Sequence, residues 1–219
     1  MLLWFVLSPL TISNPLDSSE AKIELNFERI TPTGLIEKRI NLRQLFNDYP
    51  AVSPYLLEFC YGSNLKSDSS LSSSLITFSK QEYIAKTEIE LNKRFSDLSA
   101  HKARIKGSFA RLKNQFDTLQ TPKEIVFSNS NFNYNATCYN ESILVGLERY
   151  IGGNHPLIVE SLNPSDFPEW IRNGMEENFM DRDILSSWIS TKLFKETQGY
   201  HIEEMIRWGK IHLTTEMCL

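Results

Sequence analysis

The sequence predicts an α+β domain that is predominantly helical and carries a small β-sheet. Apolar residues step by threes and fours between Ile84 and Leu119, which is the spacing of one face of a helix. Short apolar runs at residues 23–30, 123–128 and 143–147 have the length and pattern of strands, and we expect them to form the sheet. A chain of 219 residues can build one well-buried core, so residues 1–219 are predicted to form a single domain.

The composition argues against several classes of protein. Apolar residues make up 41% and charged residues 23%, which is ordinary for a globular protein. The net charge of −4 gives the chain as a whole no basic character, so we expect no nucleic-acid partner. Cys60, Cys138 and Cys218 lie far apart and allow at most one disulfide, so neither a disulfide-stapled scaffold nor a zinc knuckle is expected.

The amino-terminal residues leave two interpretations open. Met1–Leu7 is a short apolar run, and seven residues cannot span a bilayer. Residues 1–20 are either the remnant of a secretory signal segment that lacks its basic part or a segment with a buried strand. Because no cysteine directly follows the apolar run, the sequence predicts no lipid-attachment site in this chain.

The first hundred residues alternate between helical patterns and breaks. The strand at 23–30 is predicted to end at Thr31–Gly34, and Pro50 and Pro54 divide residues 40–60 into two short helices. The serine-rich stretch Ser63–Ser74 is predicted to be a surface loop.

The next region is predicted to be a long helix with a break near Ser99. Lys102 is the one polar interruption of its apolar face, whose clearest part is Ile105, Phe109, Leu112, Phe116 and Leu119. Between Lys93 and Lys113 the sequence has seven basic residues and one acid. We interpret them as a solvated face, with an anionic partner as the alternative.

The last third returns to a helical pattern. Residues 129–135 are predicted to be a turn, and Gly152–Gly153 closes the segment after the last strand. Asp181 is predicted to cap a helix whose buried face is Ile184, Leu185, Trp188, Ile189 and Leu193. After Gly199 a last amphipathic helix carries Ile202, Met205, Ile206, Leu213 and Met217. No stop signal follows this helix, so we expect that its natural continuation is missing.

No complete catalytic or metal-binding motif is present in the sequence. There is no HExxH, no GxSxG, no phosphate-binding loop and no GxGxxG, so we predict no catalytic residue, no metal ligand and no cofactor. His201 and Glu204 share a helix face, but two ligands do not make a metal site. Packing at a helix interface explains the positions of His201 and His212, and Cys138 is interpreted as a small buried residue.

The most unusual segment is Ser142–Pro156. In this segment an apolar strand is followed by Glu148 and Tyr150, and then by a glycine turn and His155. Acidic, phenolic and imidazole groups at a strand end are able to form a site. The alternative is structural, with Glu148 paired to Arg149 or to a helix terminus.

Several segments of residues 100–219 resemble the gliding-motility lipoprotein B (GldB) family, in order and with reasonable spacing. ILVGLERYIGGNHP is similar to that family's strand and Gly-Leu-acid-x-Tyr-Leu-Gly turn, and EEMIRWGKIHLTTEMCL resembles its Met-Ile-x-x-Gly-Lys helix. Four other segments fit the family's elements before and between these two: FARLKNQF, KEIVFSNSNFNY, FPEWIRNGM and RDILSSW. The positions that match the family pattern are Glu148, Tyr150, Gly152, His155, Gly209 and Lys210.

The resemblance implies a non-enzymatic, periplasm-facing cell-envelope lipoprotein of Bacteroidota-type bacteria that supports gliding motility and its secretion machinery. Its partners would be other cell-envelope proteins, and it would meet the membrane only through a lipid anchor that this chain lacks. The family is also distantly similar to zinc-peptidase-like domains, so a degenerate zincin-like fold is an expectation. Two alternatives stay open: a metal-dependent hydrolase that uses Glu148, His155, His201 or Glu204, and a helical protein-binding module that uses the basic face.

Overall fold

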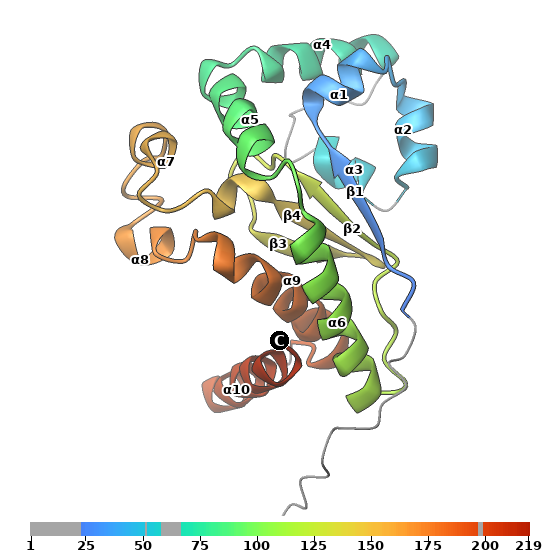
Figure 1. The fold of residues 1–219 in the computed structure, drawn as a ribbon, viewed down its shortest axis with the longest axis vertical. Helices are drawn as coiled ribbons and strands as arrows, with labels where there is room; N and C mark the ends of the chain where they lie inside the picture. Colours follow the sequence, from blue (N-terminus) through green and yellow to red (C-terminus); the bar gives the residue numbers. More distant parts are fainter. Residues whose placement is uncertain (1–22, 51, 58–66, 197–198) are drawn as a thin grey trace, which may run out of the picture.

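The computed structural model describes residues 23–50, 52–57, 67–196 and 199–219. It is a predominantly helical α+β structure with a small mixed sheet, so the predicted fold class is confirmed. Figure 1 shows the sheet in the middle of the molecule, with α1 to α4 on one side and α6, α9 and α10 on the other. The predictions for residues 1–20 and for Cys60 lie outside the described residues.

The sheet has four strands in the order β1-β2-β4-β3: β1 (Asn26–Ile30), β2 (Glu124–Ser128), β4 (Ser142–Gly146) and β3 (Ala136–Tyr139). β1, β2 and β4 are parallel, whereas β3 pairs antiparallel with β4. The three predicted strands are confirmed within a few residues. β3 was not predicted, because its residues Ala-Thr-Cys-Tyr show no apolar alternation.

The central strands β2 and β4 are buried on both faces. Ile125 and Phe127 point to one hydrophobic cluster, whereas Val126 between them points to the other. β4 repeats this pattern, with Ile143 and Val145 on one side and Leu144 on the other. Parallel strands covered by helices on both faces read as continuous apolar runs, which is why both could be found in the sequence.

The helices before β2 are α1 (Pro32–Glu37), α2 (Leu42–Asp48), α3 (Ser53–Tyr55), α4 (Asp68–Ser79), α5 (Glu82–Arg94) and α6 (Ser99–Gln115). The two short helices between residues 40 and 60 and the break near Ser99 were predicted correctly. Thr31–Gly34 does not only end the strand: the Thr31 side chain accepts a hydrogen bond from the Gly34 amide and caps α1.

The serine-rich stretch is not the predicted surface loop where the structure describes it. Its last part forms α4, which begins with a capping box between Ser67 and Ser70. Leu71, Leu75 and Phe78 then recur at helical spacing and are buried in the cluster above the sheet. The helical spacing of these apolar residues therefore predicts the structure of this segment better than its serine-rich composition does.

The elements after β4 are the 3₁₀ turn η2 (Leu147–Tyr150), α7 (Pro156–Ser161), α8 (Glu169–Arg172), the 3₁₀ turn η3 (Glu177–Phe179), α9 (Met180–Trp188), the π-helical turn η4 (Ile189–Leu193) and α10 (His201–Cys218). The apolar face of α9 packs into the core cluster as predicted. Among the described residues, none of the helices has the length and apolar character needed to cross a membrane.

Candidate functional site

Glu148 lies fully buried in η2, directly after β4. Its carboxylate accepts hydrogen bonds from the backbone amides of Ser130, at 3.0 Å, and Phe132, at 2.9 Å. The hydroxyl of Ser130 donates a third hydrogen bond. Glu148 therefore holds the loop that follows β2 against the end of β4.

The loop that Glu148 holds has an unusual backbone. Asn131 and Phe132 have φ angles of 55° and 60°, a region that side chains other than glycine rarely adopt. Burial raises the pKa of Glu148, and the three donors offset this only in part. The prediction that Glu148 pairs with Arg149 or with a helix terminus is wrong in detail, because its partners are loop amides, but the structural interpretation of this residue is favoured.

Tyr150 is also buried, and its hydroxyl donates to Oδ2 of Asp183 on α9 at 3.2 Å. Burial raises the pKa of Tyr150 well above its ordinary value, and the charge of Asp183 adds to the shift. Asp183 also accepts from the Asn135 amide at 2.9 Å and from the Arg182 guanidinium at 3.0 Å. The phenol thus ties the end of the sheet to α9.

The glycine turn and His155 have local roles. Gly152 has a φ of 103°, and its amide bonds to the carbonyl of Met175. His155 caps α7 by accepting from the Leu157 amide at 3.3 Å, and its Nε2 lies 3.7 Å from a carboxylate oxygen of Glu90. Although Glu148, Tyr150, Gly152 and His155 are close in sequence, each contacts a different part of the molecule.

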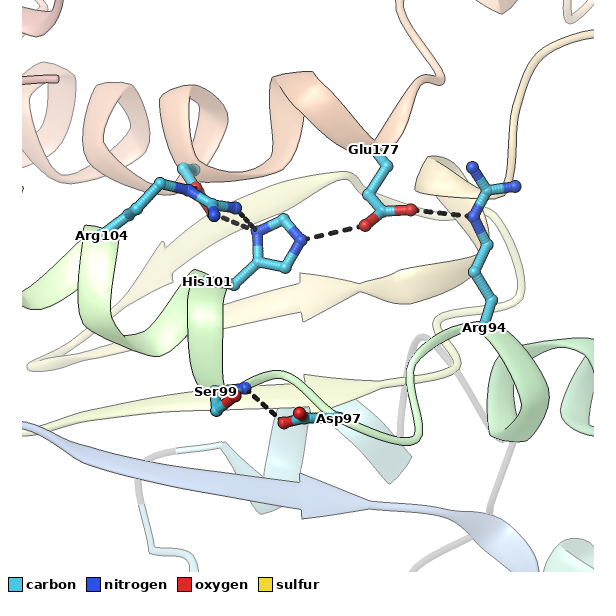
Figure 2. A network of polar contacts seen from close by, with 7 residues as sticks. Arg94, Asp97, Ser99, His101, Arg104 and Glu177 are labelled. Carbon is cyan, nitrogen blue, oxygen red and sulfur yellow. Dashed lines mark hydrogen bonds and ion pairs between the residues drawn. The ribbon is translucent and has the colours of Figure 1, made fainter.

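A polar network centred on the buried His101, which was not predicted from the sequence, joins α6 to η3 and α9. His101 lies between two carboxylates: Nδ1 is 2.6 Å from Oδ1 of Asp181, and Nε2 is 3.2 Å from Oε1 of Glu177. Arg104 bonds to the second oxygen of Asp181 at 2.6 Å, and Arg94 bonds to Glu177 at 3.0 Å. Figure 2 shows Arg94, Glu177, His101 and Arg104 in a row between the helices.

The network favours a charged imidazole. Desolvation lowers the pKa of His101, but the hydrogen bonds and charge of Asp181 and the bond to Glu177 outweigh it, so the pKa is raised overall. For Glu177, burial raises the pKa, yet Arg94 and His101 together bring it below its ordinary value. Because a protonated imidazole donates from both nitrogens, His101 is suited to hold these elements together.

Two predictions are corrected by this network. The polar position in the apolar stripe of α6 is His101, which is buried, rather than Lys102, which is only half-buried. Asp181 does not cap α9: the helix begins after Phe179 without a side-chain cap, and Asp181 lies in its first turn facing His101 and Arg104. A histidine in an apolar stripe was the signal for a buried partner.

Gly209 and Lys210 lie on α10, in a different part of the structure from Glu148. No atom lies within 4 Å of the point where a Cβ of Gly209 would be, so this position is open to solvent. Lys210 lines a hollow of about 420 Å³ together with Phe194, Glu203 and Ile206. These two family-pattern positions therefore belong to the surface of α10.

The apolar residues of α10 face outward. Five apolar side chains of this helix are 53% to 70% exposed, and we call them the outer face of α10: Ile202, Met205, Ile206, Leu213 and Met217. The buried residues of this helix are Arg207, Ile211, Thr214, Thr215 and Cys218. His201 and His212 are exposed as well, so the prediction that they pack at a helix interface is wrong within the described residues.

The inner side of α10 is fixed by hydrogen bonds as much as by packing. Arg207 donates to the carbonyl of Phe194 at 3.0 Å, and Arg111 of α6 donates to the carbonyls of Cys218 and Leu219, both at 2.7 Å. This explains how a helix can be docked by a partly polar face while a more apolar face remains outside.

The basic stretch between Lys93 and Lys113 is largely used within the molecule. Besides Arg94, Arg104 and Arg111, Lys113 donates to the carbonyls of Asp117 and Leu119. Lys102 and Lys106 both lie 5.7 Å from the ring centre of Phe27. The interpretation of this stretch as a solvated face is nevertheless confirmed for the five basic residues that are exposed, three of which also bond within the molecule: Lys93, Arg94, Arg104, Lys106 and Arg111.

The residues predicted as alternative metal ligands are not brought together. Glu148 is enclosed by its loop, His155 is beside Glu90, and Glu204 accepts from Arg207 at 2.8 Å. Cys138, predicted to be buried, is half-buried in β3. In the part of the chain that the structure describes, no group of three or more His, Cys, Asp or Glu side chains is arranged to hold a metal ion.

Comparison with known proteins supports the resemblance seen in the sequence. The model of the family described as gliding motility protein GldB matches residues 13–219. Neither the curated proteins nor the solved structures gave a match. Since the family model covers nearly the whole chain, this chain belongs to the GldB family of gliding-motility lipoproteins.

Proposed function

We propose that this protein is a non-enzymatic, periplasm-facing component of the cell envelope that supports gliding motility and its secretion machinery through protein contacts. Membership of the GldB family supports the general role in gliding motility. The observation that carries the finer proposal is the outer face of α10, which presents five large apolar side chains to solvent.

The outer face has the geometry of a helix-docking surface. Ile202, Ile206, Leu213 and Met217 recur at intervals that keep them on one side of the 18-residue helix, which is about 27 Å long. Single exposed apolar residues are normal, but a contiguous apolar patch marks an interaction site. Gly209 lies among them, and the absence of a side chain there allows another helix to approach closely.

These features favour one kind of partner, an amphipathic helix of another envelope protein. Lys210 and Glu203 at one border of the outer face and Glu216 at the other would form its polar rim, as in most protein interfaces. A helix that lays its apolar side along α10 would bury the side chains that the rest of this structure leaves uncovered.

The experiment replaces the outer face in the native bacterium and measures spreading by gliding. Ile206→Glu combined with Leu213→Glu should abolish gliding, because two buried charges would oppose the contact. The matched control is Ile89→Glu combined with Val159→Glu, which changes two exposed apolar residues on α5 and α7 and should leave gliding intact. Circular dichroism of both purified variants should show unchanged helix content, since all four side chains are exposed.

The partner is identified by a photo-crosslinking residue at position 206. Crosslinks to a component of the gliding or secretion machinery, lost on Gly209→Ala, would support the proposal, because a methyl group at Gly209 blocks close approach. Normal gliding of the Ile206/Leu213 variant would overturn it. Crosslinks only between two copies of the chain would overturn the choice of partner.

A further inference from the structure

Two hollows with polar walls lie beside α9 and share Asn135 and Asp183, and we refer to them together as the groove. Its first part is a cavity of about 370 Å³ lined by Asn135, Arg149, Trp170, Arg182 and Asp183. Its second part, of about 310 Å³, shares Asn135 and Asp183 with the first and continues along β3 to Trp208. Figure 1 shows β3 next to α9, with α8 beyond the amino-terminal end of α9.

The first cavity contains a cation whose hydrogen bonding is incomplete. The Nε atom of Arg149 is buried and has no hydrogen-bond partner in the described residues. An arginine stays protonated in proteins, and leaving one of its donors buried and unsatisfied is costly. Arg149 lines the cavity, whereas its Nε atom is covered by protein atoms, so a ligand would meet the charge of this side chain rather than its unsatisfied Nε–H.

The surroundings of Arg149 leave the cavity with a positive balance. Arg182 also lines it, and the one carboxylate of its wall, Asp183, is already bonded to Arg182, Asn135 and Tyr150. Neighbouring Glu148 is enclosed by its own loop. Since Arg182 is paired with that carboxylate, the wall carries one net positive charge, that of Arg149, which favours the binding of an anion.

Aromatic rings hold both guanidinium groups in place. Arg149 lies 5.1 Å from the ring centre of Phe167, and Arg182 lies 4.2 Å from that of Phe179. Cation–π contacts of this kind restrict the two side chains before a ligand arrives. The anion-binding groups are therefore arranged in advance.

Two tryptophans flank the groove. Trp170 borders the first cavity and is 75% exposed, and Trp208 borders the second and is 55% exposed. Neither indole is needed in the core at these exposures. The electron-rich face of an indole attracts the weakly positive C–H groups on the flat side of a pyranose ring, for the same reason that it attracts cations.

The floor between the tryptophans is rich in hydroxyl groups, which are contributed by Thr137, Ser186, Ser187, Ser190 and Thr191. Three of them, those of Ser187, Ser190 and Thr191, donate to carbonyls of the preceding helical turn. Since a hydroxyl has one donor and two acceptor sites, their lone pairs remain to accept hydrogen bonds from a ligand. Sugar hydroxyls are donors of that kind.

From this combination we infer that the groove binds an acidic saccharide, with a sugar carboxylate on Arg149, its ring on Trp170, and the following sugars along the hydroxyl floor toward Trp208. The inference is independent of the outer face of α10, since none of the five residues of that face lines the groove.

The test uses the full chain and isothermal titration with a tetramer of galacturonic acid. The matched neutral probe is the same tetramer with its carboxylates methyl-esterified. We expect the acid to bind and the ester to bind at least about tenfold more weakly, the effect of losing one hydrogen bond between charged groups. Equal binding of both, or no binding of the acid at millimolar concentration, would overturn the proposal.

Variants locate the site. Arg149→Lys keeps the charge but loses the forked donor, and Trp170→Ala removes an exposed ring, so each should weaken binding of the tetramer by about tenfold or more. Arg43→Gln, which changes an exposed arginine on α2, should have no effect. Trp208→Ala should weaken the tetramer but not the monomer of galacturonic acid.

Two outcomes would reject the assignment of ligand class. If Arg149→Lys and Trp170→Ala bind the tetramer as the unchanged protein does, the groove is not the site. If a short acetylated peptide with a free carboxylate binds in an Arg149-dependent way and the tetramer does not, the groove binds peptides rather than saccharides.

Discussion

Nδ1 of His101 lies 2.6 Å from Oδ1 of Asp181, so a histidine of α6 is bonded to a carboxylate of α9 that is 80 residues away in the sequence. The same ring reaches Glu177 with its other nitrogen. The contact joins two helices that pack against the same face of the sheet. The contribution of this contact to the free energy of unfolding depends on pH.

His101→Gln should lower the free energy of unfolding by about 1–3 kcal/mol at pH 6, since the ring bonds to two carboxylates. Because the folded-state pKa of His101 is raised, its stabilisation is complete below the unfolded pKa of about 6.5 and is lost as the pH rises through the folded value. Urea unfolding between pH 5.5 and 9 should therefore show the difference from the unchanged protein shrinking as pH increases. His212→Gln, on an exposed histidine, is the control, and identical pH profiles for both variants would contradict the expectation.

Glu148→Gln should destabilise the protein by about 1–3 kcal/mol, because the amide nitrogen that replaces Oε2 would face the Ser130 amide and cannot accept from it. Burial raises the pKa of this carboxyl in the folded protein. Glu148 therefore stabilises the folded state less as the pH rises from the unfolded pKa of about 4.3 through the folded value. The loss measured by chemical unfolding should therefore be larger at pH 4 than at pH 7. Glu160→Gln, at an exposed position on α7, should change neither value. Unchanged stability of the Glu148 variant would show that the loop does not depend on this carboxyl.

Gly146→Ala should cost about 1–3 kcal/mol, because the added methyl group would collide with the backbone carbonyl of Tyr134 and with the Ser130 side chain. The opposite result is expected for Gly209→Ala, where nothing lies within 4 Å of the new methyl group. Since alanine is the better helix former, Gly209→Ala should raise the stability of the isolated protein by about 0.5–1 kcal/mol. Thermal unfolding of the two variants side by side tests this difference in sign.

Arg111→Gln should release the end of α10 from α6, because the arginine donates to the carbonyls of Cys218 and Leu219. Hydrogen exchange measured by mass spectrometry should become faster in α10 and stay unchanged in β2 and β4, which are the best-buried strands. Lys106→Gln, on an exposed residue of the same helix, should leave the exchange of α10 unaltered. Equal protection of α10 in all three proteins would show that packing alone holds it.

Residues with a strong local signal were predicted well, and residues with distant partners were not. β2 and β4 were found because Ile125–Phe127 and Ile143–Val145 are apolar on both faces. β3 was missed because Ala136 and its neighbours become a strand only by pairing with β4. His101 was overlooked for the same reason, since both of its carboxylate partners lie more than 70 residues away.

The sequence by itself determined the helical periodicity, the strands β2 and β4 and the family to which the chain belongs. Those properties depend on residues close together in the sequence, so the spacing and type of the side chains are enough to predict them. Only the tertiary structure decided which side of α10 faces the core. Both sides of that helix carry apolar residues, and the choice depends on hydrogen bonds that Arg111 and Arg207 make to carbonyls distant in sequence. Periodicity shows that a helix has an apolar face, whereas what covers that face depends on where the rest of the chain has folded.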